Sequence, residues 1–366
     1  MEDLRESLVA RALASGWAAA GVAALEPFDL ERRRALDAID AGRMDGMEWF
    51  TRERVEAAAD LRARYPWAQS AIVLAWPYAP ARPLDPVADA AEPSSPVGRV
   101  SAYACLEDPD GVVDYHDSLR RHCDDLAAWI RETQPGTRVK RFIDHGWALD
   151  RALAERAGIG FCGKNTCLIT VEAGSYVLIA TLLTSLPLPP TKRSHRGCGH
   201  CTACLPACPT GALIAPGIMD ARRCIAYLTI EHRGAIPVEL RPLIGTWVFG
   251  CDLCQEACPI NQRLAPAPIA QPEPGDRRGP VAFPELLDLL SLDDAEFDRR
   301  YRRTAIARTG RNGLVRNAAI ALGNAGDVAA VPALRRVAAS DTDAVVREAA
   351  AWAAERLSTA AAEATA

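Results

Sequence analysis

Cysteines at short, regular intervals are the residues of this sequence best suited to chemistry. A first run reads Cys-x2-Cys-x2-Cys-x3-Cys-Pro, and a second, about fifty residues later, reads Cys-x2-Cys-x3-Cys-Pro. Thiolates at the first spacing hold cubic [4Fe-4S] clusters, and the last cysteine of such a run ligates a second cluster rather than its own. The pattern therefore predicts two clusters. The cysteines of the two runs are Cys198, Cys201, Cys204, Cys208, Cys251, Cys254 and Cys258.

Two [4Fe-4S] clusters need eight thiolates, one more than the two runs provide. Cys224 is the one cysteine between the runs, and it completes the set. Because the last cysteine of each run crosses to the other cluster, the eight thiols divide into two groups of four. We expect one cluster to be held by Cys198, Cys201, Cys204 and Cys258. We expect the other to be held by Cys208, Cys224, Cys251 and Cys254.

Zinc sites and disulfides are the two simpler explanations of paired cysteines. A structural zinc site closes with four ligands and does not explain a crossing cysteine followed by proline in both runs. Disulfides are typical of oxidising compartments and of small secreted domains. The sequence suggests neither setting, so its spacing favours iron–sulfur chemistry.

The remaining composition is that of an ordinary packed protein without signs of export. Its 366 residues, 49% of them hydrophobic, are enough for two or three domains. No basic stretch precedes an apolar one at the start, no twin-arginine signal is present, and no run approaches about eighteen apolar residues. We expect a cytoplasmic protein with no membrane contact, and a monomer. The net charge of −5 means that any nucleic-acid surface must be local.

The residues before the cysteine runs are predicted to form an α/β domain over residues 1–190. Spacing of apolar residues predicts a helix at 115–131, with Cys123 in the core instead of at a site, and another at 149–157. Residues 1 to about 60 are also predicted to form helices. Apolar runs predict buried strands at residues 71–75, 138–143, 167–171 and 176–183.

The end of the strand at 138–143 is the position of greatest interest in this domain. It delivers Asp144 at the carboxyl edge, where ligands bind in open α/β sheets. A glycine-rich loop follows at 158–166 and offers Lys164 and Asn165 to a ligand. A plain turn between a helix and a strand explains that loop equally well.

Two further domains are predicted, which makes the fold class α+β and multidomain. Residues 191–270 form a two-cluster, bacterial ferredoxin-like domain, and a proline-rich linker follows. The stretch 314–319 is echoed at 345–350, which predicts HEAT-like α-helical repeats over residues 281–358. Residues 359–366 are predicted to be a frayed tail.

Short motifs along nearly the whole chain add a family resemblance. They lie at residues 114–116, 142–144, 151–155, 158–160, 163–166, 209–213, 220–225, 227–231, 249–252 and 316–324. Together with the cysteine runs they resemble the epoxyqueuosine reductases, which are cobalamin-dependent iron–sulfur enzymes of tRNA modification. Many ferredoxins share the cysteine runs, whereas the added Gly-Lys-Asn-Thr loop and helical tail make the combination specific.

The resemblance implies a reaction and its participants. Epoxyqueuosine at the wobble position of tRNA is reduced to queuosine, and the electrons come from an external low-potential donor through the two clusters to a base-off cobalamin. That cofactor is expected between the first domain and the clusters. Asp144 matches the proton donor of the family, a role that a carboxyl group can fill when burial raises its pKa. An aspartate at the end of a strand is otherwise more often a helix cap or an ion-pair partner.

The resemblance also assigns contact residues. The expected cobalamin contacts are Arg62, Ser101, Asp144, Lys164, Asn165, Cys251 and Asp252. Local arginine patches are the expected tRNA contacts, although a charged run alone is more often a solvated face. The candidates are Arg222, Arg223, Arg233, Arg302, Arg303, Arg308, Arg311 and Arg316. The sequence departs from the family pattern in an insertion at 106–113 and in the residues 145–147, both beside the expected site.

Two other functions fit part of the pattern. A reductive dehalogenase also joins a corrinoid to two clusters, but such enzymes typically carry a twin-arginine leader and lack the helical tail. A ferredoxin-type electron carrier with a partner-binding solenoid would need no catalytic carboxyl group. Bound cobalamin, together with about eight irons per chain, distinguishes the reductases from that carrier.

Overall fold

The computed structural model describes most of the chain. The described residues are 1–78, 96–105, 107–108, 111–112, 114–193, 196–264 and 282–363. Residues 79–95, most of the proline-rich linker and part of the 106–113 insertion therefore lie outside them. Within that insertion, β4 (Glu107–Asp108) pairs antiparallel with β5 (Gly111–Val112).

A four-stranded sheet forms the centre of the first domain. Its strand order is β1-β2-β9-β6, and every neighbouring pair is antiparallel. The prediction of an α/β domain is therefore wrong, since that class is built on parallel strands, and the ligand rule for parallel edges does not apply. The strands are β1 (Ala19–Ala23), β2 (Ser70–Pro77), β6 (Val139–Ile143) and β9 (Val177–Thr184).

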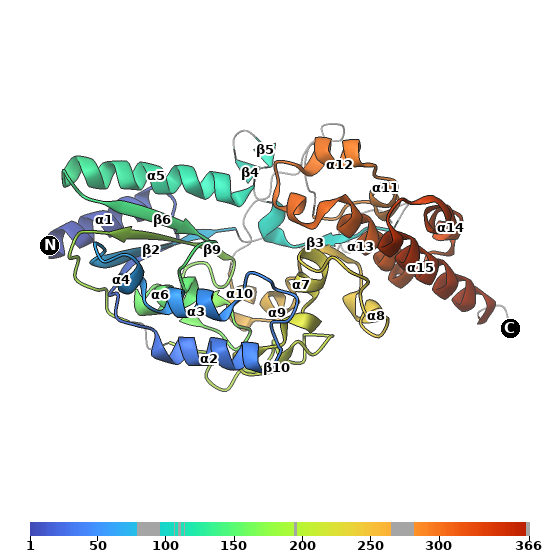
Figure 1. Cartoon of the computed structure of the whole chain (residues 1–366), viewed down its shortest axis with the longest axis horizontal. Coiled ribbons are helices and arrows are strands. Elements are labelled where there is room, and N and C mark those ends of the chain that lie inside the picture. Colours follow the sequence, from blue (N-terminus) through green and yellow to red (C-terminus); the bar gives the residue numbers. More distant parts are fainter. Residues whose placement is uncertain are drawn as a thin grey trace.

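Helices cover both faces of this sheet (Figure 1). Alternate residues of β2 divide between two cores, with Ile72 and Leu74 on one side and Val73 on the other, as the pleat requires. The first face packs against α1 (Glu2–Ala14) and α5 (Tyr115–Thr133), where Cys123 is fully buried as predicted. The second face packs against α3 (Arg52–Ala59), α4 (Leu61–Arg64) and α6 (Asp150–Arg156), with α2 (Asp29–Asp40) outside them.

Short elements make up the region of the cysteine runs. A small parallel ladder between β3 (Arg99–Val100) and β12 (Trp247–Phe249) ties this region to the first domain. Such short elements suit a region whose chain must turn repeatedly to bring thiols together. The others are β10 (Leu213–Ala215), β11 (Ile218–Met219), α7 (Ile225–Ile230), α8 (Arg241–Ile244), α9 (Leu253–Glu256) and α10 (Pro259–Gln262). Short elements before the two cysteine runs are η1 (Ala102–Cys105), β7 (Phe161–Cys162) and β8 (Leu168–Ile169). Between the two runs lies η2 (Ala221–Arg223).

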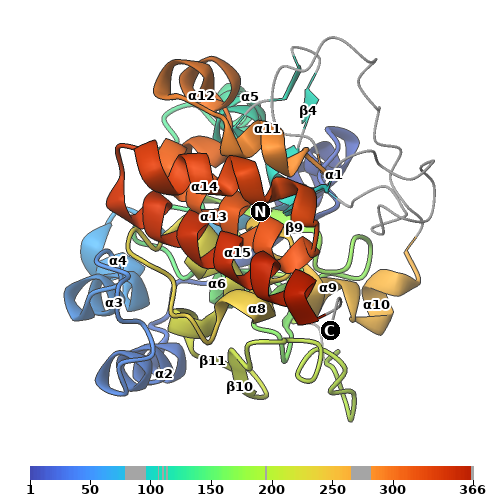
Figure 2. The ribbon, with the colours of Figure 1, turned by 90° about the vertical axis from the view of Figure 1, so that its right-hand side faces the viewer.

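Helices form the C-terminal part, and Figure 2 shows the last three side by side. The two echoed stretches lie on α13 (Gly310–Ala325) and α15 (Ala344–Glu363), which pack closely because Gly323 leaves no Cβ against the backbone of Ala353. Their helical conformation is as predicted, while the assignment to HEAT repeats stays a prediction. The remaining elements are α11 (Leu286–Leu290), α12 (Asp294–Tyr301), η3 (Ala305–Thr309), η4 (Val328–Ala330) and α14 (Val331–Ser340).

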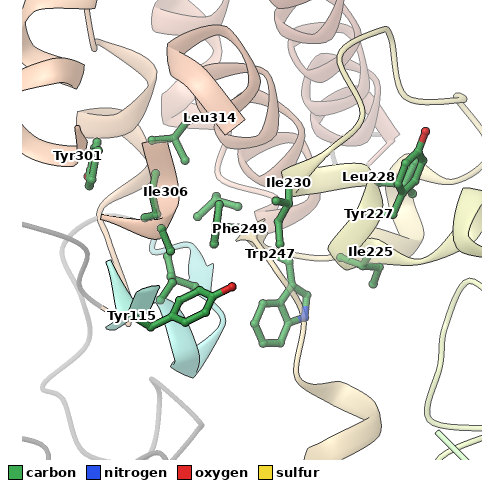
Figure 3. Close-up of a cluster of buried hydrophobic side chains, with 14 of the residues drawn as sticks. Tyr115, Ile225, Tyr227, Leu228, Ile230, Trp247, Phe249, Tyr301, Ile306 and Leu314 are labelled. Carbon is green, nitrogen blue, oxygen red and sulfur yellow. The ribbon is translucent and has the colours of Figure 1, made fainter. Parts of the chain in front are cut away.

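One hydrophobic core runs through all three predicted domains. It joins the first domain to α7, β12 and α13. Figure 3 shows part of it, where Tyr115 lies near Phe249 and Ile306, with Leu314 above them. Buried apolar contacts of this extent oppose independent movement of the three parts.

Candidate active site

The first predicted group of cysteines is assembled in the structure. Burial, followed by the charges of Cys198, Cys201 and Cys258, raises the pKa of Cys204. All four side chains are free thiols. Cys258 therefore crosses from the second run to the first group, as its spacing predicted.

The second predicted group is assembled in the same way. Burial raises the pKa of Cys224, and the neighbouring charge of Cys208 adds to the effect. Burial also raises the pKa of Cys251, with Cys224 among its charged neighbours. Cys254 completes the group, since both Cys251 and Cys224 act on it. Thiolates that are buried close together repel one another, which costs free energy unless iron neutralises their charge. Four neighbouring cysteines of this kind are what a cluster site requires.

Zinc and a cubane hold their thiolates at different separations. In the described ranges, no three or more His, Cys, Asp or Glu side chains converge closely enough to hold one ion. Tetrahedral zinc with Zn–S bonds of about 2.3 Å would bring its thiolates within about 4 Å of one another. A cubane spreads four thiolates over four irons, so a wider arrangement is expected.

The Gly163–Cys167 loop, formed by residues 163–167, touches both groups of cysteines. The backbone N–H of Lys164 donates to the sulfur of Cys198 at 3.4 Å, and its ammonium group donates to the carbonyl of Gly199 at 2.8 Å. The side-chain amide of Asn165 donates to the carbonyl of Cys254 at 3.3 Å. The loop thus lies against one cysteine group at Lys164 and against the other at Asn165.

Asp252 forms the centre of a buried hydrogen-bonded network beside the second group. Its carboxylate accepts from the hydroxyl of Ser101 at 2.6 Å, from the backbone N–H of Ala102 at 2.8 Å and from the amide of Gln255 at 3.1 Å. Burial raises the pKa of Asp252 despite these donors. Gly250, with φ +69°, allows Ser101 to pack against the backbone, since a Cβ at residue 250 would clash with Ser101. The predicted contacts Ser101, Cys251 and Asp252 are thus adjacent.

Asp144 follows β6 directly and is exposed to solvent. Its backbone is left-handed, with φ 50°, a conformation that costs free energy for a residue other than glycine and is often retained at functional sites. The hydroxyl of Tyr115 donates to its carboxylate at 2.5 Å. That contact fixes the direction of the carboxyl group without burying it.

Tyr103 lies near both Asp144 and Asp252. Burial raises its pKa well above the usual value for tyrosine, and the charges of Asp144 and Asp252 act in the same direction. Its ring packs edge-on against that of Tyr115, with 5.7 Å between ring centroids. Arg308 of η3 lies near Tyr115 and Asp144. Burial lowers its pKa, but the hydrogen bond to Glu231 and the nearby Tyr115 and Asp144 raise it more strongly.

Comparison with known proteins places this site in a family. Residues 197–261 match a family described as "4Fe-4S double cluster binding domain", and residues 59–145 match "Epoxyqueuosine reductase QueG, DUF1730". The epoxyqueuosine reductase of Gloeobacter violaceus is 37% identical over 333 residues, which are 89% of this chain and 98% of the relative. The chain belongs to the epoxyqueuosine reductase family.

Solved epoxyqueuosine reductases share the whole fold. A Bacillus subtilis structure, described as having a catalytic aspartate loop swung out of the active site, aligns with a TM-score of 0.84 at 33% identity. A complex with an epoxyqueuosine-modified tRNA-Tyr stem loop gives the same values. Each alignment covers 97% of this chain and 90% of the other. Within the part of the chain that the structure describes, no helix is long and apolar enough to cross a membrane.

Two of the arginines expected to contact tRNA have structural roles in this reductase. Arg316 is 1% exposed, and its guanidinium group donates to the carbonyls of Leu228, His232 and Gly234 at 2.7–2.8 Å. Arg311 is held by the carboxylate of Asp341 and by a backbone carbonyl. The prediction of tRNA contact is corrected for Arg316, because its side chain is buried inside the protein. For Arg311 it stays a prediction.

The other predicted arginines are exposed. Arg222 pairs with Asp220, Arg223 donates to the carbonyl of Thr210, and Arg308 pairs with Glu231. Arg233 donates to backbone carbonyls of α7 and η3. Arg302 and Arg303 lie on the surface between α12 and η3. Arg62 is exposed on α4, and no described contact joins it to the other expected cobalamin residues.

Three side chains of the site were not predicted from the sequence. Tyr115 lies inside the 114–116 motif, so the motif marked the position but not its contact with Asp144. Tyr103 and Cys167 had no local signal, because their contacts join segments far apart in the chain.

Proposed function

We propose that this chain is an oxidoreductase that reduces epoxyqueuosine to queuosine in tRNA. The observation that carries the proposal is the meeting of two four-thiol groups, the Gly163–Cys167 loop and the exposed carboxyl of Asp144 in a member of this family. Removal of the epoxide oxygen as water, leaving a carbon–carbon double bond, takes two electrons and two protons. The chain must therefore deliver both.

The two [4Fe-4S] clusters supply the route for electrons. The double-cluster domain at residues 197–261 contains all eight thiols of the two groups. We assign Cys198, Cys201, Cys204 and Cys258 to the first cluster, and Cys208, Cys224, Cys251 and Cys254 to the second. The second group lies next to Asp252 and, through Tyr103, near Asp144. Electrons from an external low-potential donor would therefore leave by the second cluster.

The residues around Asp144 and Asp252 fit a bound cobalamin. Of the expected contacts, Ser101, Cys251 and Asp252 are adjacent, Asn165 bonds to the neighbouring Cys254, and Asp144 shares Tyr103 with Asp252. Tyr103 is partly exposed among them, which offers a flat aromatic surface to a flat macrocycle. Cobalamin bound here would supply a low-potential metal centre for reduction of the epoxide. Arg62 has no support from this geometry.

Asp144 is proposed to hold and deliver the proton that leaves with the epoxide oxygen. A carboxyl group serves as a general acid when it lies within hydrogen-bond reach of the atom that it protonates. Tyr115 orients this carboxyl group, and its exposure leaves one side open to a substrate. The bound cofactor and substrate must therefore shield the carboxyl group of Asp144 from water, because the protein alone leaves it exposed.

A positive surface beside Asp144 is proposed to bind the tRNA backbone. Arg308 lies near Asp144, and Arg302 and Arg303 are exposed just before it. Phosphate contacts of this kind position the RNA, while the modified base must be unstacked to reach the carboxyl group. Arg222, Arg223 and Arg233 stay proposed contacts on the cluster side.

The wider organisation is part of the same proposal. We assign residues 1–190 to the cobalamin and catalytic domain, 191–270 to the cluster domain and 281–358 to HEAT-like repeats. The prediction of a frayed tail from residue 359 is wrong as far as Glu363, because α15 continues to that residue. We propose a monomer that works in the cytoplasm, where tRNA is modified. Membership of the reductase family displaces the alternatives of a dehalogenase or a simple electron carrier.

An anaerobic turnover assay tests the proposal directly. The reconstituted chain, with cobalamin and a chemical reductant, should convert an epoxyqueuosine-containing stem loop to the queuosine form. Asp144→Asn should lose turnover while cluster and cobalamin absorbance stay at parental levels. Asp117→Asn, an exposed aspartate on α5, is the matched control and should keep full activity. Turnover by Asp144→Asn at the parental rate would remove Asp144 from the mechanism.

A further inference from the structure

An edge of the central sheet carries a row of cations and aromatic rings outside the site described above. β6 is the last strand in the order β1-β2-β9-β6, and it ends one residue before Asp144. Side chains at alternate positions of a strand share a face, so those at residues 138, 140 and 142 lie together. Residues from the end of α4 and from the turn after β6 contact this face. We call the set the β6 strip, and it consists of Arg64, Tyr65, Trp67, Arg138, Lys140, Phe142 and Trp147.

The two ends of the β6 strip are cations stacked on indole rings. The guanidinium carbon of Arg138 lies 4.5 Å from the ring centroid of Trp67. At the other end, the guanidinium carbon of Arg64 lies 3.8 Å from the ring centroid of Trp147. A guanidinium group that stacks through its face keeps the N–H groups in its plane available to an anion. Both ends therefore offer hydrogen-bond donors next to an aromatic surface.

Tyrosine and phenylalanine rings join the two ends. The ammonium group of Lys140 lies 5.6 Å from the ring centroid of Tyr65 and 5.8 Å from that of Phe142. The ring centroid of Tyr65 lies 6.3 Å from that of Trp67 and 5.8 Å from that of Phe142. The turn after β6 packs on the same surface, because Gly146 leaves no Cβ against the ring of Phe142. The β6 strip thus reaches the turn that carries the proposed proton donor.

The cations of the β6 strip carry charge that no carboxylate neutralises. Arg64, Arg138 and Lys140 are exposed, and in the described ranges none of them forms an ion pair. The chain as a whole has a net charge of −5, so the strip is a local positive surface on a negative protein. Other exposed arginines of this domain are paired with carboxylates, among them Arg52, Arg120 and Arg141.

We propose that the β6 strip binds the RNA strand next to the modified nucleoside, with phosphates on its three cations and unstacked bases on its rings. Proteins bind single-stranded RNA by combining basic grooves with aromatic rings on which bases stack. Carboxylates of an acidic protein would pair with the cations but would not stack on the rings. This inference rests on the proposed function, because RNA held at Asp144 brings its neighbouring nucleotides to the strip.

The length of the β6 strip sets how much RNA it covers. A strand rises about 3.3 Å per residue, so the path from Arg138 to Asp144 is about 20 Å long. Neighbouring nucleotides of a stacked strand are about 3.4 Å apart, which makes this path about six nucleotides long. Trp67, at the far end, is therefore too distant to touch the reacting nucleoside. A substitution of Trp67 separates RNA binding along the strip from events at Asp144.

Titration of the cluster-loaded chain with the epoxyqueuosine-containing stem loop, at several salt concentrations, tests the proposal. The strip variant combines Arg64→Gln, Arg138→Gln and Lys140→Gln. It should bind more weakly, and its slope of log affinity against log salt should be shallower by about 2, because three phosphate contacts are lost. The matched control removes the same charge from three paired arginines and should keep the parental slope. Its substitutions are Arg52→Gln, Arg120→Gln and Arg141→Gln.

A second variant tests the rings. Trp67→Leu should weaken stem-loop binding about tenfold at every salt concentration, since a stacking surface is lost but no charge. Polyglutamate, a polyanion without bases, should bind the parent more weakly than the stem loop does, and Trp67→Leu should not change its binding. Cluster absorbance at the parental level, with titrations well below Tm, ensures that folded proteins are compared.

Two results would overturn the proposal while the parent still binds the stem loop. The first is a salt slope in the strip variant equal to that of the matched control. The second is stem-loop binding by Trp67→Leu at parental affinity, which together with tight polyglutamate binding would assign the strip to an acidic protein. Either result leaves the proposed function standing. Failure of the parent itself to bind the stem loop would instead overturn both.

Discussion

Replacement of the buried Arg316 by methionine tests whether this residue is structural. Its guanidinium group satisfies the backbone carbonyls of Leu228, His232 and Gly234, and it also bonds to the side chain of Asn317. Burial lowers its pKa to about 10, so it stays charged at neutral pH. Arg316→Met fills a similar volume but leaves four acceptors without this donor, namely the three backbone carbonyls and the Oδ1 atom of Asn317.

The expected loss of stability follows from those four acceptors. Each unsatisfied buried acceptor costs about 1–3 kcal/mol, and loss of the buried charge offsets part of the sum. We expect unfolding to become easier by about 3–5 kcal/mol. An unfolding entropy near 2.1 cal/mol/K per residue gives about 0.8 kcal/mol/K for 366 residues, so Tm should fall by about 4–6 °C.

Calorimetry and stem-loop binding on the same cluster-loaded samples separate the structural role from an RNA contact. Arg316→Met should lower Tm, with binding measured well below Tm unchanged. Arg302→Met, at an exposed position, should leave Tm within about 1 °C of the parent. Weaker RNA binding by Arg316→Met at parental Tm would refute the structural interpretation.

Three further predictions follow from the site. Tyr115→Phe removes the donor to Asp144 and should slow turnover by about tenfold, as loss of a hydrogen bond of roughly 1.5 kcal/mol implies, with unchanged cofactor absorbance. Arg302→Glu combined with Arg303→Glu should weaken stem-loop binding and reduce its salt dependence, measured by titration at several salt concentrations. Burial, and then the charge of Asp144, raises the pKa of Asp150 to about 7, so the folded chain holds a proton that the unfolded chain releases above about pH 4. Unfolding free energy should therefore fall as pH rises toward 7, and Asp150→Asn should flatten that dependence in denaturant titrations at pH 5–8; an equally steep slope in the variant would contradict this.

The gathering of the cysteines into two groups could be predicted from the sequence because their spacing is local. Cluster geometry fixes the distance between neighbouring thiols. The order of the cysteines therefore also predicted that Cys258 of the second run lies near Cys204 of the first. The left-handed Asp144 was located through its strand and motif. Helix α5 and strands β2 and β9 were also predicted, since long amphipathic or apolar runs have clear periods.

Contacts between distant segments could not be predicted. The sheet is antiparallel because β2 and β6 both pair with β9, and no local pattern specifies such partners. Strand β1 is made mostly of alanine and glycine, which gives no strand signal. Arg316 looked like part of a charged surface, because the backbone carbonyls that bury it come from residues more than eighty positions away.

The Gly163–Cys167 loop contacts both cysteine groups, so damage to either group affects the whole site. If oxygen destroys either cubane, the loop loses one of its two contacts, and the placement of Asn165 beside Cys254 is no longer held. We expect a damaged copy to stop accepting its nucleoside altogether. Electrons from the external donor are then not consumed by a protein that has lost one of its clusters.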